Sequence, residues 1–171
     1  MHFEIAHEFD IPLDALELAV ISPTLVDKLA PKLKKSNIDD ISQKSHDLKN
    51  GVLERVWHYQ ANVNVPPFAR GYVTREMCAW DEESTYDLKR HTSSWRIVPN
   101  VKPEWRKYFS AAGTYRIASL GDGRARRIVE GTLELRVPPV FRQVAERMIV
   151  GEVKKTFEAE AATLRDMATL I

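Results

Sequence analysis

The chain has 171 residues, of which 44% are hydrophobic, so it is long enough for one domain with a sizeable core. Basic and acidic residues nearly cancel, at 25 against 24, which argues against a dedicated nucleic-acid-binding protein. The single cysteine, Cys78, excludes an internal disulfide framework, and no apolar run is long enough for a membrane-spanning helix. The first residues lack a basic segment followed by an apolar run, so we expect a cytoplasmic location.

The first third of the sequence predicts a strand followed by two short helices. Residues His2–Phe9 alternate strictly and place Phe3, Ile5, His7 and Phe9 on one face, as in a half-buried strand. A capping residue followed by proline then occurs twice, and it predicts helices over residues 12–20 and 23–32.

The centre of the sequence predicts six strands. The Lys49–Gly51 segment favours a hairpin because Asn50 and Gly51 both tolerate positive φ. Lys89-Arg90 supplies a second tight turn, and Gly121-Asp122-Gly123 a third. The predicted strands cover about residues 38–48, 52–63, 80–88, 93–97, 109–120 and 126–137.

Residues 138–171 predict one long helix, because proline occurs only at the start of this segment. Unbroken, the helix would extend about 50 Å. An apolar residue recurs every fourth position, which on a helix of 3.6 residues per turn drifts around the cylinder and suits packing on a twisted sheet. This stripe comprises Phe141, Ala145, Ile149, Val153, Phe157 and Ala161, and Gly151 interrupts it as a candidate kink.

The predicted order is β-α-α-β6-α over one domain, residues 1–171. This order resembles the START-like, polyketide-cyclase-like (SRPBCC) superfamily. Val137-Pro138-Pro139 before the last helix is similar to an uncharacterised bacterial branch of it, and Glu82–Asp87 with the basic turn after it resembles the PRELI/MSF lipid-transfer proteins. The resemblance implies an α+β helix-grip fold, in which a curved antiparallel seven-stranded sheet surrounds a long C-terminal helix.

The helix-grip resemblance also implies that sheet and helix enclose an apolar ligand, a lipid-like or polycyclic molecule. Large aromatic residues on several predicted inward faces are typical of a pocket lining, and Gly113 and Gly131 on those faces would leave room. The alternative is that the same side chains fill a solid core. The predicted ligand-binding residues are Phe3, Ile5, His7, Arg55, Trp57, Tyr59, Trp80, Glu82, Tyr86, Trp95, Tyr115, Leu133, Leu135, Val153 and Phe157.

Three ionisable residues, His7, Arg55 and Glu82, lie on predicted inward faces. Buried charges need partners, so together they could orient the polar head of a ligand or act as base and electrophile in an enzyme. The alternative is that they lie near a strand edge or satisfy one another internally.

The remaining motifs exclude several classes of site. The five histidines lack the paired spacing of a zinc site, and the sequence has no glycine-rich phosphate loop or exposed-serine elbow, so we predict no metal, no cofactor and no catalytic residue. The leading hypothesis is therefore a carrier or sensor of a hydrophobic small molecule or lipid. A cyclase-like enzyme and a protein-interaction domain with a filled groove are the alternatives.

Two basic clusters and one apolar loop are candidates for surface contacts. The clusters are Arg124–Arg127 and Lys32–Lys35, which we interpret as solvated faces, with anionic lipid or nucleic-acid phosphate as the alternative. The segment Val65–Phe68 is either an apolar lip that makes transient membrane contact or an ordinary packed loop. Because the total charge is near neutral, we expect no nucleic-acid partner.

Overall fold

The computed structural model describes residues 1–62, 64–65, 67, 70–71 and 74–170 of the chain. Its element order confirms the predicted succession of one strand, two helices, six strands and a long helix. The elements are β1 (His2–Phe9), α1 (Leu13–Val20), α2 (Leu25–Leu33), β2 (Ile38–Lys49), β3 (Val52–Ala61), η2 (Glu76–Cys78), β4 (Ala79–Asp87), β5 (Thr92–Pro99), η3 (Pro103–Tyr108), β6 (Phe109–Gly121), β7 (Arg124–Leu135) and α3 (Pro139–Ala168).

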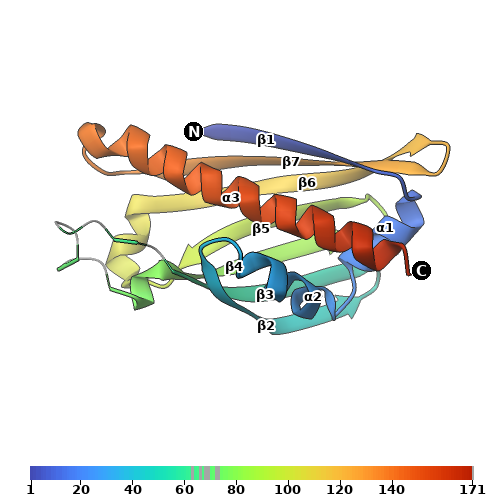
Figure 1. The fold of residues 1–171 in the computed structure, drawn as a ribbon, viewed down its shortest axis with the longest axis horizontal. Helices are drawn as coiled ribbons and strands as arrows, with labels where there is room; N and C mark the ends of the chain where they lie inside the picture. Colours follow the sequence, from blue (N-terminus) through green and yellow to red (C-terminus); the bar gives the residue numbers. More distant parts are fainter. Residues whose placement is uncertain (63, 66, 68–69, 72–73, 171) are drawn as a thin grey trace.

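The seven strands form one antiparallel sheet in the order β1-β7-β6-β5-β4-β3-β2. Figure 1 shows α3 running diagonally across one face of this sheet, with α1 and α2 on the same side near the C-terminus. Both short helices contact α3. This arrangement is the helix-grip fold that the resemblance implied. None of the helices in the described ranges is long and apolar enough to cross a membrane.

The hairpin turns form where the sequence predicts them. Asn50 and Gly51 both have positive φ, at 51° and 76°, as a two-residue turn between twisted strands requires. The turn after β4 comprises residues 88–91 and ends on His91, whose φ is also positive at 56°, so it is two residues longer than Lys89-Arg90. The second short helix begins at Leu25 and not at residue 23, because the Ser22 hydroxyl accepts a hydrogen bond from the Thr24 amide and forms a local turn first.

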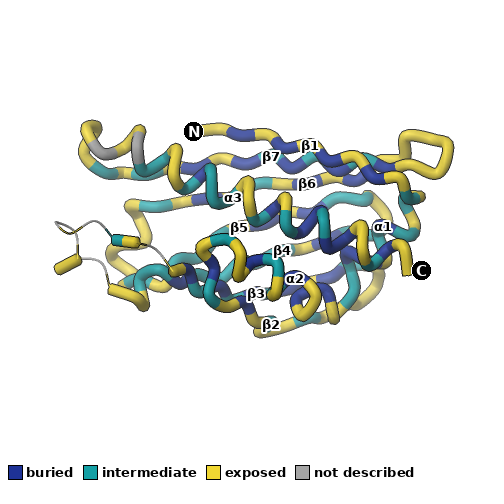
Figure 2. Tube along the Cα trace, viewed as in Figure 1, coloured by how far each residue is buried: buried dark blue, intermediate teal, exposed yellow. Residues whose placement is uncertain are grey.

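The strands alternate between buried and exposed residues, and their buried face packs against the helices (Figure 2). In β1 and β3 every second residue is buried. Antiparallel pairing aligns the inward residues in rows across the sheet. One row joins Arg55 to Ser84, Ser84 to Trp95, and Trp95 to Gly113.

Helix α3 is buried unevenly along its length. In its C-terminal half Phe157, Ala161 and Leu164 are buried, whereas in its N-terminal half Val150 is buried but Ile149 and Val153 are only half-buried. The helix is continuous through Gly151, so the predicted kink is absent there. The side chain of Phe141, the first residue of the predicted stripe, lies outside the described part of the chain. The helix thus has a tightly packed half and a more accessible half.

Candidate ligand site between the sheet and the C-terminal helix

The fifteen predicted ligand-binding residues share one location, the interior between the sheet and α3. The strand residues among them lie on the inward face: Phe3, Ile5 and His7 on β1, Arg55, Trp57 and Tyr59 on β3, Trp80, Glu82 and Tyr86 on β4, Trp95 on β5, Tyr115 on β6, and Leu133 and Leu135 on β7. Val153 and Phe157 come from α3. The structure brings these residues together on one surface, and their contact with a ligand stays a prediction.

Aromatic rings fill the middle of this interior. Trp95 lies between Phe3 and Phe157, with ring centroids 6.2 and 6.0 Å away. The space that Gly113 and Gly131 leave is occupied by these rings, because a Cβ at Gly113 would lie 2.6 Å from Trp95 Cζ2 and one at Gly131 would lie 2.5 Å from Phe3 Cζ. The expectation that the two glycines leave room for a ligand is therefore wrong. They instead allow aromatic side chains to lie flat on the sheet.

A buried ion pair ties α3 to β7. Arg127 is fully buried and donates from Nη1 to Glu160 Oε2 at 2.7 Å and from Nη2 to the Phe157 carbonyl at 3.1 Å. Its Nη2 also lies 3.4 Å from His7 Nδ1. A charge pair this deep needs several hydrogen bonds to offset its desolvation, and Arg127 makes them to both helix and strand. The interpretation of the whole Arg124–Arg127 cluster as a solvated face is consequently wrong at Arg127.

His7 is satisfied inside the same network. Its Nε2 lies 2.9 Å from Glu158 Oε1, while its Nδ1 faces the Arg127 guanidinium. Burial lowers the pKa of His7, the charge of Arg127 lowers it further, and the Glu158 carboxylate opposes both. A neutral imidazole that accepts at Nδ1 and donates from Nε2 fits all of these contacts. His7 is thus a structural connection between β1 and α3.

Arg55 connects β3 to the first helix. Its Nη1 donates to the Val20 carbonyl at 3.0 Å, at the end of α1, and its guanidinium stacks 3.9 Å from the centre of the Trp57 ring. Its Nε is buried and has no acceptor among the described residues. Arg55 therefore retains one unused donor in the interior.

Tyr86 and Tyr115 lie at the same end of the interior as α1. Their rings are 5.8 Å apart, and the Tyr86 hydroxyl donates to Glu17 Oε1 at 2.7 Å. His91 Nδ1 also lies 2.7 Å from this carboxylate oxygen. Burial raises the pKa of both phenols, so they remain protonated donors. The polar groups at this end are paired.

Glu82 differs from these paired groups. It faces inward from β4, between Trp57 on β3 and Ile97 on β5, and none of the described residues donates a hydrogen bond to it. Burial raises the pKa of Glu82 to about 7, and the charge of Glu160 adds to this effect, whereas Arg55 and Arg127 oppose it. Near neutral pH, Glu82 can therefore either accept or donate a hydrogen bond.

Tyr59 lies beside Glu82 on the neighbouring strand. The residue is only 2% exposed, and its ring stacks on Trp80 with centroids 5.2 Å apart and planes 9° from parallel. Within the described ranges no residue hydrogen-bonds to its hydroxyl. Burial raises the pKa of Tyr59 well above its ordinary value, and the negative charge of Glu82 adds to this effect. Among the described residues neither Glu82 nor the Tyr59 hydroxyl has a hydrogen-bond partner, and both lie on a largely apolar surface.

The interior is most accessible at the end of the sheet where η3 leads into β6. Residues there face inward yet remain half-buried, which means that helix α3 does not cover them fully. They are Trp80 and Glu82 on β4, Ile97 on β5, Phe109 on β6, Leu135 on β7, and Ile149 and Val153 on α3. We call this set the open half of the interior.

Two hollows of about 480 and 380 Å³ lie on the opposite, outer face of the sheet. Both are shallow and open to solvent. Outward-facing polar residues of β3, β4, β5 and β6 contribute to their walls, among them Glu54, Glu83, Arg96 and Thr114. Such polar, shallow surfaces do not suit an apolar ligand.

The chain matches the family model described as "Protein of unknown function (DUF2505)" over residues 4–167. It belongs to the DUF2505 family. No curated protein matches the chain.

Solved structures share the fold of this DUF2505 protein. The Zhui aromatase/cyclase from Streptomyces sp. R1128 is 14% identical with a TM-score of 0.64, over 99% of this chain and 93% of that one. Norcoclaurine synthase from Thalictrum flavum, in complex with dopamine and hydroxybenzaldehyde, is 12% identical with a TM-score of 0.65, over 97% and 87%. TTHA0849 from Thermus thermophilus is 14% identical with a TM-score of 0.62, over 99% and 98%. These similarities establish a START-like, helix-grip fold.

Sequence reasoning missed Arg127 and Glu160 as interior residues of the DUF2505 chain. A signal existed for Arg127, because it shares the alternation of Ala125, Val129 and Leu133 on β7, all of which are buried. The sequence contains a weaker signal for Glu160. Its position between Phe157 and Ala161 does not reveal how far the buried face of the helix extends around the cylinder.

Proposed function

We propose that this DUF2505 protein binds a hydrophobic small molecule, lipid-like or polycyclic, in the open half of the interior. The observation that carries this proposal is the half-burial of inward-facing residues on four strands and on α3 at one end, where a fully packed core would bury them. Each Å² of apolar surface that a ligand removes from water contributes roughly 25 cal/mol. Covering these side chains would therefore supply most of the affinity.

Two further features support the proposal. Glu82 and the Tyr59 hydroxyl provide free hydrogen-bonding groups within the aromatic surface, as is usual where a few polar groups orient an apolar ligand. Norcoclaurine synthase, which has the same fold, was solved with two small aromatic molecules, dopamine and hydroxybenzaldehyde. A protein with this fold can therefore bind small aromatic molecules.

The first test is to extract the purified protein with organic solvent and identify any bound molecule by mass spectrometry. The second is a titration with the uncharged fluorescent probe N-phenyl-1-naphthylamine. Val153→Trp, which fills the open half from α3, should weaken probe binding at least about tenfold. Lys154→Trp, which places the same ring on the exposed side of the helix, should leave it unchanged. Absence of both a co-purified molecule and probe binding in the unmodified protein would refute the proposal.

The inward, half-buried position of Glu82, together with its raised pKa, favours a cyclase-like enzyme as the second candidate function. A carboxyl group with a pKa of about 7 exchanges protons readily at neutral pH, which is the property of a general acid or base. If the bound molecule found by extraction is converted by the protein, Glu82→Gln should abolish turnover and retain binding. Glu83→Gln, on the outer face of the same strand, is the matched control. Equal turnover by Glu82→Gln and the unmodified protein would exclude this role.

A further inference from the structure

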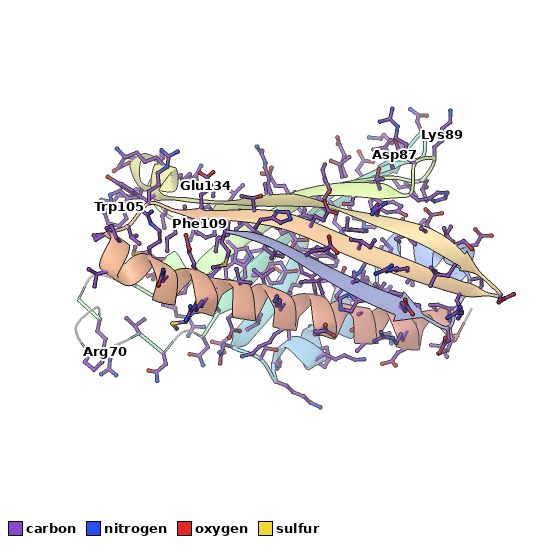
Figure 3. The ribbon with its side chains drawn as sticks, turned by 90° about the horizontal axis from the view of Figure 1, so that it is seen from above. Arg70, Asp87, Lys89, Trp105, Phe109 and Glu134 are labelled. Carbon is purple, nitrogen blue, oxygen red and sulfur yellow. The ribbon has the colours of Figure 1, made fainter. Side chains whose placement is uncertain are left out.

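Two segments distant in sequence lie side by side at the end of the sheet next to the open half. The Arg136 amide donates to the Tyr108 carbonyl at 2.8 Å, and Phe109 pairs with Leu135 in the ladder between β6 and β7. Figure 3 shows Trp105, Phe109 and Glu134 at this same end, far from Asp87 and Lys89. We define the end surface as residues 102–108, which include η3, and residues 136–142, which lead into α3.

The end surface exposes large apolar side chains. Trp105 is 43% exposed, Tyr108 46% and Val140 82%. Isolated exposed apolar residues are common on soluble proteins, but here an indole, a phenol and an aliphatic side chain occupy adjoining segments. Tryptophan and tyrosine combine an apolar ring with a polar tip, which suits them to the boundary between water and lipid.

The end surface is also positively charged. Its two segments contain five basic residues and one acidic residue, although the whole chain has a net charge of only +1. Lys102 and Lys107 lie over the rings of Trp105 and Tyr108, with Nζ 5.8 and 5.2 Å from the ring centres. Arg136 forms a 3.9 Å ion pair with Glu134, and within the described part of the chain none of the other four cations has an acidic partner. These other four are Lys102, Arg106, Lys107 and Arg142.

We propose that the end surface docks the protein on an anionic membrane. Such a membrane supplies negatively charged headgroups for the unpaired cations and an interfacial layer for the rings of Trp105 and Tyr108. An acidic protein surface would match the cations, but a membrane also supplies the boundary between water and lipid that suits the exposed rings lying beneath Lys102 and Lys107. The docking site thus differs from Val65–Phe68, the loop in which the sequence suggested a membrane contact, and part of that loop lies outside the described residues.

The described side chains of the end surface are exposed apart from the half-buried Val137, so membrane docking does not depend on a ligand in the interior. The end surface does, however, lie next to the proposed ligand site. Phe109 belongs to the open half and immediately follows Tyr108 of the end surface. If the interior does hold a lipid-like molecule, docking would place the entrance of the site at the membrane from which the molecule is taken.

The experiment measures binding of the full chain to sedimented vesicles. One set contains phosphatidylcholine alone, and the other contains one part phosphatidylserine to two parts phosphatidylcholine. We expect binding only to the second set, with affinity that falls as salt is added because ions screen the attraction. The double variant Arg106→Glu/Lys107→Glu should bind at least about tenfold more weakly. Trp105→Ala should also weaken binding, by about fivefold or more.

The matched control is Lys34→Glu/Lys35→Glu, which makes the same charge change at two exposed adjacent positions without exposed aromatic residues beside them. It should bind as the unmodified protein does. Equal loss in both double variants would overturn the proposal, because binding would then depend on total charge. Equal binding to the two sets of vesicles, or no binding to either, would overturn it as well. Circular dichroism of each variant verifies that these surface substitutions leave the fold intact.

Discussion

The two ends of the interior differ in how their inward side chains are covered and paired. At the end formed by α1, α2 and the last turns of α3, apolar residues such as Leu16 and Leu164 are fully buried, and Arg127 and Tyr86 have carboxylate partners. At the other end Tyr59 and Leu133 are buried, but several inward residues, among them Trp80 and Val153, are only half-buried, and Glu82 lacks a donor among the described residues. One half of the interior therefore stabilises the fold through tight packing and paired charges, while the other half has apolar surface and a carboxyl group that the packing leaves partly uncovered.

Of the variants that distinguish the two ends, Arg127→Leu should lower the free energy of unfolding the most. This substitution leaves the Glu160 carboxylate buried without its partner, which costs about 3–5 kcal/mol. We expect the free energy of unfolding in urea to fall by that amount. Arg124→Leu, at an exposed position on the same strand, should leave it nearly unchanged. The double variant Arg127→Leu/Glu160→Leu should recover much of the loss, and a loss below about 1 kcal/mol in the single variant would contradict the assignment of the pair to the stable end.

Truncations on α3 sharpen the same comparison. Leu164→Ala removes a fully buried side chain and should lower the free energy of unfolding by about 3 kcal/mol. Ile149→Ala, on the half-buried part of the same helix, should cost about 1 kcal/mol or less because solvent or neighbouring groups can occupy the vacated space. Urea denaturation of the two variants measures the difference. Equal losses would indicate that both halves are packed alike.

The smallest expected effect is a pH dependence that originates at Glu82. Its pKa is about 7 in the folded chain against 4.5 in the unfolded chain, so between these values the unfolded chain binds fewer protons than the folded one. The free energy of unfolding therefore falls as pH rises from about 4.5 to about 7 and loses about 1–3 kcal/mol from this group. Glu82→Gln should remove this loss.

Denaturation at several pH values, with Glu83→Gln as the control on the outer face, measures this contribution. An unchanged pH profile in Glu82→Gln would show that Glu82 is well solvated, and the contrast between the two ends would then rest on burial alone.

Much of the site could be predicted because strand alternation is a local property. Phe3, His7 and Glu82 each lie on the face that the alternation of apolar and polar residues along their strand indicates, and the structure places them inside. The hydrogen bonds and ion pairs that inward residues form depend on partners far away in sequence. His7 meets Glu158 on α3, and Arg127 on β7 meets Glu160, although no local pattern pairs these residues.

The succession of strands and helices, the positive-φ turn at Asn50-Gly51 and the inward face of every strand except β2 could be read from the sequence, since all of these depend on residues within a few positions. Which of the inward residues are covered depends on contacts between elements that are distant in sequence. Phe3 and Trp95 fill the space above Gly113 and Gly131, and the diagonal path of α3 buries one end of the interior and leaves Trp80 and Glu82 half-covered at the other (Figure 1). The physical reason is that burial depends on how side chains from separate elements pack, and that packing exists only once the helix lies on the sheet.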